Sequence, residues 1–137
     1  MALILDTGPL LAAFDAHDPD HDRCASLITE TREDLIVPTL VLAELDYWCA
    51  RRLTVADWLM FVDDIVAGAY RVIPPTVSDL ARCRDLQGRY LDLDLGVVDA
   101  SIVALAERLD EPKVATLDHR HFATVRPAHR DALELLP

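Results

Sequence analysis

Short apolar runs alternate along the chain with segments of helical periodicity. The runs are rich in Leu, Ile and Val and have the length of buried strands rather than of helices. The first of them, Ala2–Leu5, has no polar residue, as expected for a strand that is covered on both faces of a sheet. The sequence predicts strands over residues 2–5, 35–37, 70–73 and 113–117, and it leaves a short C-terminal tail unassigned.

Helices are expected between these strands. Apolar residues recur there at intervals of three and four, and Thr, Asp or Pro stands near several of the starts. Asp18 is expected to cap the second helix, because a proline follows it. The expected helices cover residues near 9–14, 19–31, 39–52, 54–68, 76–90 and 97–109. This alternation predicts an α/β fold, with a mostly parallel sheet between two layers of helices.

The composition fits a single globular domain over residues 1–137. The chain is 52% hydrophobic and 27% charged, and it contains no repeat or linker. Its three cysteines are far apart, which excludes a zinc knuckle or a C-x-x-C redox motif. Neither a signal peptide nor an apolar run of membrane-spanning length is visible, so we expect a cytoplasmic protein without membrane contact.

The net charge of −11 disfavours nucleic acid as a partner, because proteins that bind phosphate usually carry a basic surface. Two arrangements remove this objection. Clustered carboxylates can hold divalent cations that supply positive charge at the site, and a basic protein partner can cover the acidic surface.

Two acidic residues follow predicted strands. Asp6 comes directly after Ala2–Leu5, and Asp118 directly after the predicted strand over residues 113–117. The carboxyl ends of parallel strands meet at one edge of the sheet, where such folds bind their ligands. A helix cap or a turn is the ordinary alternative for each residue alone.

Two further acids lie on or beside the apolar faces of predicted helices. On a helical wheel Asp99 falls between Val103 and Ala106, on the side that the core should cover. A carboxylate there is costly unless it is paired or bound to a cation, although capping of the helix start is an alternative. Glu44 lies beside the apolar stripe of its helix, whereas Asp46 faces away from it. The alternative for Glu44 is an ordinary glutamate at the edge of the stripe, with its carboxylate in water.

Together Asp6, Glu44, Asp99 and Asp118 form a set of oxygen ligands that needs no histidine or cysteine. Such a set selects Mg²⁺ or Mn²⁺ over zinc. Bound ions of this kind promote hydrolysis of phosphodiesters. Thr7 and Thr116 stand beside these acids, where their hydroxyls can orient a carboxylate.

Four segments resemble the motifs of PIN-domain nucleases, and they occur in the family's order over nearly the whole chain. The opening segment, Leu3-Ile-Leu-Asp-Thr-Gly-Pro-Leu-Leu11, carries Asp6. The second, Pro38-Thr-Leu-Val-Leu-Ala-Glu-Leu45, carries Glu44. The third, Leu95-Gly-Val-Val-Asp-Ala-Ser-Ile-Val-Ala104, carries Asp99, and the last, Val114-Ala-Thr-Leu-Asp118, carries Thr116 and Asp118.

The chain is most similar to the VapC-type toxins of toxin–antitoxin pairs. That resemblance implies a PIN-like single domain with Asp6, Glu44, Asp99 and Asp118 as catalytic residues and metal ligands. It implies an Mg²⁺- or Mn²⁺-dependent endoribonuclease that cuts structured RNA such as tRNA, rRNA or mRNA. It also implies a homodimer that is neutralised in a complex with a cognate antitoxin.

The sequence departs from the family pattern at one position. Relatives often carry a further acid three residues after the last motif, where this chain has His121. The departure puts a fifth ligand and a second metal site in question. Asp92 and Asp94 are possible auxiliary acids, with an exposed loop as the alternative, and Trp48 is expected in the core or in a dimer contact.

Other functions remain open on the sequence alone. A response-regulator phosphoacceptor would have a second acid after the first strand, and a haloacid-dehalogenase phosphatase would have Asp-x-Asp there; Thr7-Gly8 follows Asp6 instead. The stronger alternative is a PIN-like module that binds RNA or protein without cutting.

Overall fold

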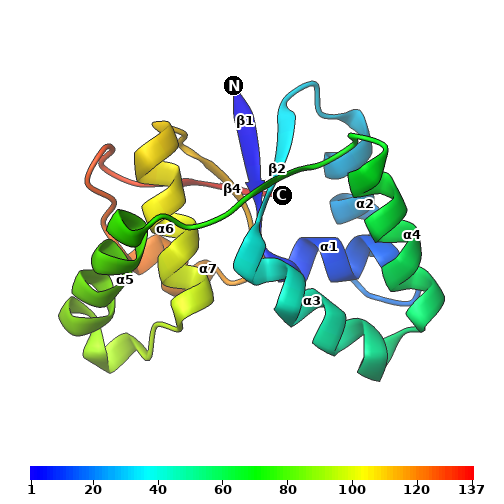
Figure 1. The fold of residues 1–137 in the computed structure, drawn as a ribbon, viewed down its shortest axis with the longest axis horizontal. Coiled ribbons are helices and arrows are strands. Elements are labelled where there is room, and N and C mark those ends of the chain that lie inside the picture. The colour runs from blue at the N-terminus through cyan, green and yellow to red at the C-terminus, as the bar shows by residue number, and fades with distance from the viewer.

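The computed structural model describes residues 1–137 and has a single parallel β-sheet at its centre (Figure 1). All four pairs of neighbouring strands run parallel, in the order β3-β2-β1-β4-β5. The strands are β1 (Ala2–Leu5), β2 (Asp34–Pro38), β3 (Arg71–Ile73), β4 (Lys113–Ala115) and β5 (Glu134–Leu136). The prediction of an α/β fold with a parallel sheet is confirmed.

Helices lie on both sides of this sheet. Figure 1 shows α1, α2 and α4 on one side and α5 and α6 on the other. The helices are α1 (Thr7–Phe14), α2 (His21–Glu30), α3 (Thr39–Arg52), α4 (Val55–Val66), α5 (Val77–Arg89), α6 (Val97–Leu109) and α7 (His119–Thr124), with a 3₁₀ turn at Leu91–Leu93. No helix is long and apolar enough to cross a membrane.

The core is built around β1, the central strand. All four residues of β1 are buried, because β2 and β4 pair with its edges and helices cover its faces. Apolar side chains of α1, α3 and α6 complete the core, including Leu10, Leu45 and Ile102. Burial on both faces explains why β1 has no polar residue.

The order in which the chain adds strands to the sheet changes direction at β1, although all strands stay parallel. The strands β2 and β3 extend the sheet on one side of β1, and β4 and β5 extend it on the other. The segments after β1 and β4 therefore lead into different helices, α1 and α7. Such a switch point opens a crevice at the carboxyl ends of the strands, and Asp6 and Asp118 both lie there.

Two local predictions are wrong. The helix α2 begins at His21, and the Asp18 carboxylate instead accepts a hydrogen bond from the Asp20 N–H (2.8 Å) in the preceding turn. The strand β4 ends at Ala115, so Asp118 does not directly follow it. The tail, which the sequence left unassigned, forms the strand β5 on the edge of the sheet. A three-residue strand is too short to leave a periodic signal.

Candidate functional site

Asp6 links the end of β1 to the start of α1 and is almost fully buried. Its side chain has a fixed orientation, because each oxygen accepts one hydrogen bond. The Thr7 N–H donates to Oδ1 (2.8 Å), and the Thr116 hydroxyl donates to Oδ2 (2.8 Å). Asp6 is thus the N-cap of α1, as the alternative assignment holds, but one of its oxygens is held by a residue 110 positions away.

Thr116 connects the ends of two neighbouring strands. While its hydroxyl donates to Asp6, it accepts a hydrogen bond from the Asp118 N–H (3.0 Å). This buried hydroxyl ties the backbone at Asp118 to the carboxylate of Asp6. Asp118 in turn caps α7 by accepting a hydrogen bond from the His121 N–H (3.2 Å).

Glu44 and Asp99 reach the same place from helices α3 and α6. Asp99 lies in the first turn of α6. The N-cap of this helix is Gly96, which has no side chain, so no side chain caps the helix from that position. Glu44 is half-buried, whereas Asp46 on the same helix is exposed. The helical pattern therefore distinguished correctly between these two acids of α3.

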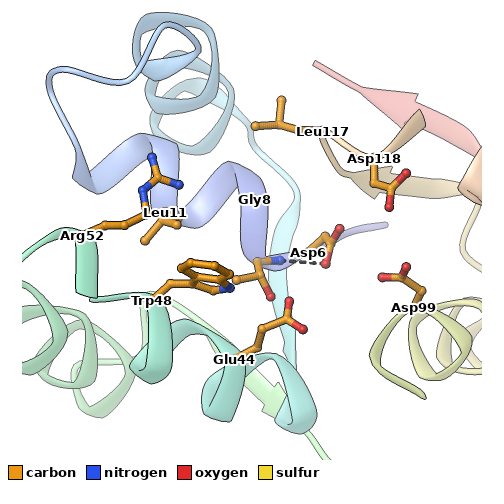
Figure 2. Close-up of a pocket in the computed structure, with 10 residues that line it drawn as sticks. Asp6, Gly8, Leu11, Glu44, Trp48, Arg52, Asp99, Leu117 and Asp118 are labelled. Atoms are coloured by element: carbon orange, nitrogen blue, oxygen red, sulfur yellow. Dashed lines mark hydrogen bonds between the residues drawn. The ribbon is translucent and has the colours of Figure 1, made fainter. Parts of the chain in front are cut away.

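The four carboxylates line one cleft of about 580 Å³. Figure 2 shows their carboxyl groups converging on one space, with Trp48 and Arg52 at the other end of the cleft. The full lining is Asp6, Thr7, Gly8, Leu11, Glu44, Trp48, Arg52, Asp99, Leu117 and Asp118. Residues from four separate parts of the sequence thus form one acidic site.

Mutual repulsion and burial make this site unfavourable for negative charge. Burial, followed by the charge of Asp99, raises the pKa of Asp6 to about 7, although the hydrogen bonds from Thr116 and Thr7 oppose the shift. Burial also raises the pKa of Asp99, with further increases from Asp118 and Glu44. A bound cation would relieve both effects.

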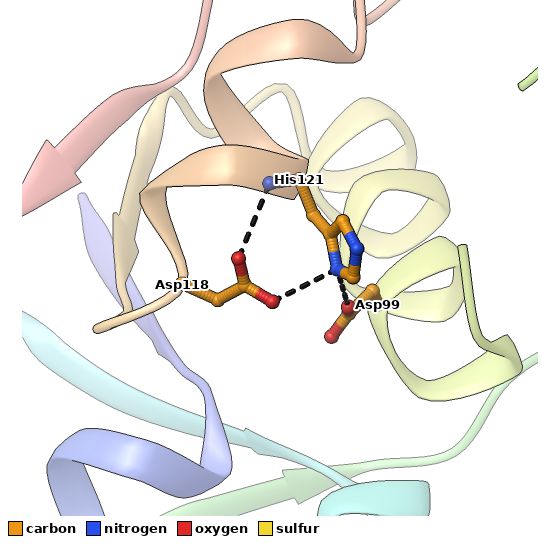
Figure 3. Close-up of side chains that lie close together, drawn as sticks. All are labelled: Asp99, Asp118 and His121. Carbon is orange, nitrogen blue, oxygen red and sulfur yellow. Dashed lines mark hydrogen bonds and ion pairs between the residues drawn. The ribbon is translucent and has the colours of Figure 1, made fainter. Parts of the chain in front are cut away.

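His121, the residue at which the sequence departs from the family pattern, contacts this acidic cluster. Nδ1 of His121 lies 2.8 Å from Oδ2 of Asp99 and 2.8 Å from Oδ2 of Asp118 (Figure 3). Burial lowers the pKa of His121, but the hydrogen bond to Asp99 and the charges of Asp118 and Asp99 outweigh it, so the net shift is upward. The structure thus adds an imidazole nitrogen beside two of the predicted oxygen ligands, whose role as ligands stays a prediction.

Trp48 lies at the surface. It is 40% exposed and lines the cleft, so of its two expected positions the core is wrong, and the dimer contact stays a prediction. Nearby, Arg52 contributes a cation to the cleft, and it pairs with Asp18 (3.1 Å) and Asp15 (3.7 Å). Asp92 and Asp94 are exposed and do not line the cleft, as the loop alternative holds.

Residues in and beside the cleft fit a divalent cation. Oxygen or nitrogen atoms of Asp99, Asp118 and His121 all lie within 4.8 Å of one another. In addition, the Thr7 hydroxyl oxygen is buried beside Asp6 without a hydrogen-bond partner. A cation and its water ligands would satisfy this hydroxyl and would compensate the Asp6 carboxylate, which has no cationic partner in the chain.

Comparison with known proteins identifies the family. The model of the PIN domain matches residues 3–126. Ribonuclease VapC26 of Mycobacterium tuberculosis is 33% identical over 135 residues, which cover 98% of this chain and 100% of that protein.

Solved structures show the same fold. The structure of VapC20 of Mycobacterium tuberculosis, described as a sarcin-ricin loop cleaving toxin, matches with a TM-score of 0.83 and 18% identity, over 99% of this chain and 100% of that chain. The structure of VapBC2 of Rickettsia felis, bound to a DNA fragment from its promoter, matches with a TM-score of 0.71 and 18% identity over 100% of both chains. The chain therefore belongs to the PIN-domain family and is a VapC-type member of it.

Proposed function

We propose that this chain is an endoribonuclease toxin that hydrolyses structured RNA with the help of a divalent cation, Mg²⁺ or Mn²⁺. The convergence of Asp6, Glu44, Asp99 and Asp118 in one cleft carries this proposal. The names of two similar proteins agree with it, since one is a ribonuclease and the other a toxin that cleaves the sarcin-ricin loop. The fragments produced from total cellular RNA would identify the class of RNA that is cut, whether tRNA, rRNA or mRNA.

In this mechanism the carboxylates hold and orient the reacting groups. A divalent cation bound among them supplies Lewis-acid stabilisation of the negative charge that develops on the phosphate. Asp6 keeps one orientation because Thr7 and Thr116 bind its two oxygens. Asp99 and Asp118 present ligand oxygens from α6 and from the start of α7.

Glu44 has a different task in this proposal. It lines the cleft from α3 and either completes the ligand set or positions the attacking water. The water attacks phosphorus in line, and by family analogy the products carry a 5′-phosphate and a 3′-hydroxyl. The chain itself contributes no covalent nucleophile.

The cleft also offers contacts for an RNA strand despite the net charge of −11. The exposed indole of Trp48 provides a face on which a base can stack. Arg52 provides a guanidinium group for a phosphate, and its pairing with Asp15 and Asp18 holds it at the cleft. A positively charged whole surface is therefore not required for local binding of one strand.

We also propose that a cognate antitoxin neutralises the chain in a heterocomplex and that the chain forms a homodimer. A basic segment of an antitoxin would pair with the carboxylates and exclude RNA from the cleft. Large apolar side chains that are exposed in the single chain could pack against another protein chain. They include Val77, Leu80, Leu91 and Val97. Light scattering of the protein with and without its antitoxin measures both assembly states.

The test is cleavage of total cellular RNA by the purified, antitoxin-free protein. We expect discrete fragments with Mg²⁺ or Mn²⁺ and none with EDTA. Asp99→Asn should lower the cleavage rate by on the order of 10³-fold, because it removes a charged ligand from the cluster. Asp46→Asn, an exposed acid of α3, is the matched control and should cleave at the normal rate.

Two results would contradict the proposal. Cleavage that survives Asp99→Asn would indicate a contaminating nuclease. A folded protein that binds RNA but cuts none of it with either metal would instead favour the non-cutting PIN-like module.

A further inference from the structure

His121 occupies a place where a cation would be expected. Its Nδ1 atom lies between two carboxylates that belong to different helices, at 2.8 Å from Oδ2 of Asp99 and 2.8 Å from Oδ2 of Asp118. In Figure 3 the imidazole ring stands beside Asp99 with Nδ1 directed at both acids. The ring nitrogen therefore belongs to the polar surface of the cluster rather than to a separate structural contact.

Two of the four carboxylates in the cleft form a compact group with His121, which lies beside the cleft. The atoms of Asp99, Asp118 and His121 lie within 4.8 Å of one another, and neither Asp6 nor Glu44 belongs to this close set. Asp6 is instead held by Thr7 and Thr116. Asp99 and Asp118 therefore line the cleft with Asp6 and Glu44 and also contact an imidazole that lies beside the cleft.

We propose that His121 is a metal ligand, and that Asp99, Asp118 and Nδ1 of His121 form a mixed oxygen–nitrogen site that prefers Mn²⁺ over Mg²⁺. The inference rests on the proposed function, because it concerns the cation of the same cleft. It adds a ligand and a metal preference that the four carboxylates alone do not specify.

The preference follows from ligand chemistry. Mg²⁺ binds oxygen ligands in near-ideal octahedral geometry and retains several waters. Divalent transition ions bind N- and O-containing sites more readily, and imidazole is a common ligand for them. A ligand nitrogen binds the ion through its lone pair, so any proton on Nδ1 would be released to solvent when the ion binds.

The position of His121 on α7 supports direct ligation. Asp118 caps this helix and accepts a hydrogen bond from the His121 N–H (3.2 Å), so the backbone already fixes the two residues relative to each other. Preorganised ligands of this kind lose little freedom when an ion binds. His119, on the same helix, is exposed and makes no comparable contact with the acids, so it serves as the control.

The experiment measures Mn²⁺ coordination directly by pulsed electron paramagnetic resonance. Wild-type protein loaded with Mn²⁺ is expected to show coupling to a histidine nitrogen, and His119→Gln is expected to retain it. His121→Asp, which makes the set all oxygen, is expected to lose the coupling. In a competition experiment, the ratio of Mn²⁺ affinity to Mg²⁺ affinity should be ~10-fold lower in His121→Asp than in the wild type.

Several outcomes would overturn the inference. Bound Mn²⁺ without nitrogen coupling in the wild type would do so, and that measurement needs no variant to fold. An unchanged ratio of Mn²⁺ to Mg²⁺ affinity in folded His121→Asp would do so as well. Cleavage of RNA is assayed separately. An active nuclease whose bound Mn²⁺ shows no nitrogen coupling would contradict only the role of His121 as a ligand. A protein that shows nitrogen coupling but cuts no RNA would contradict only the proposed ribonuclease function.

Discussion

Two carboxylates of this protein are buried to nearly the same extent but have opposite surroundings. Asp79 of α5 is 5% exposed and Asp6 is 6% exposed. Asp79 pairs with the Arg108 guanidinium (Nε to Oδ2, 3.0 Å) and accepts a hydrogen bond from the Thr76 N–H (3.0 Å) in a capping box. Asp6 has two hydrogen bonds but faces Asp99 and Glu44 instead of a cation.

The difference separates a carboxylate that is paired within the chain from one that is not. Arg108 also donates to the Pro74 carbonyl (3.1 Å), so the pair joins α6 to the segment before α5. The charge of Asp79 is compensated by Arg108, whereas no cation of the chain pairs with Asp6. Burial alone thus does not distinguish the two acids, whereas the sign of the neighbouring charges does.

The largest expected effect on stability is loss of the compensated acid. Asp79→Ala should lower the free energy of unfolding by about 3 kcal/mol, because it leaves Arg108 unpaired and removes the capping box. Urea denaturation measures the change. Asp85→Ala, which breaks an exposed pair on the same helix, should change stability by less than about 0.5 kcal/mol. Equal effects of the two variants would remove the distinction between Asp79 and an ordinary surface acid.

Replacement of Asp6 is expected to stabilise the metal-free protein rather than to destabilise it. At pH 8 without metal, Asp6→Asn should raise the free energy of unfolding by about 2 kcal/mol, since it removes a buried charge whose pKa is raised. The same variant should lose RNA cleavage. Urea denaturation and the cleavage assay give the two readouts, and a destabilised Asp6→Asn protein would mean that the carboxylate is compensated after all.

The pH dependence of stability should follow the same cluster. An acid with a raised pKa binds its proton more tightly in the folded state, so stability falls as the pH rises from the unfolded pKa of 3.8 to the folded value of about 7 for Asp6. Asp99 shifts in the same direction. The pKa of His121 is also raised, so its stabilising contribution is complete below 6.5 and is lost as the pH rises through the folded pKa.

All three groups therefore lower the free energy of unfolding as the pH rises. We expect the free energy of unfolding of metal-free protein to fall by about 3 kcal/mol between pH 5 and pH 8, since Asp6 alone spans roughly two pKa units of this range. Saturating Mn²⁺ or Mg²⁺ should reduce the fall, and Asp6→Asn should reduce it without metal. Urea unfolding at the two pH values is the measurement, and stability that increases over this range in metal-free protein would contradict the prediction.

The smallest effect is expected at Thr116, which orients the uncompensated acid. Thr116→Val should lower stability by about 1 kcal/mol, since it removes one hydrogen bond to Asp6 and one from Asp118. It should also weaken Mn²⁺ binding by ~10-fold, as loss of an orienting partner does. Titration calorimetry measures the binding, with exposed Thr124→Val as the control. Unchanged metal affinity in Thr116→Val would show that the hydroxyl does not orient the site.

Much of this arrangement could be predicted from local sequence. Thr54 and Thr76 were expected at the starts of helices, and each forms a capping box in the structure. The apolar residues of Ala2–Leu5 and the periodicity around Asp99 and Glu44 are local patterns. Such patterns were sufficient to predict β1 to β4, α1 to α6 and the edge where the acids meet, but neither α7 nor β5. The role of the four acids as metal ligands and catalysts stays a prediction.

The contacts that distinguish the acids depend on residues far apart in the chain. His121 and Asp99 are 22 residues apart, and Arg108 and Asp79 are 29 apart. The exposure of Trp48 and the pairing of β5 with β4 likewise depend on which elements pack together. Local patterns of polarity determined the fold class and the positions of the acids along it, whereas only the tertiary structure decided which charges meet, because electrostatic pairing depends on distance in space and not on separation in sequence.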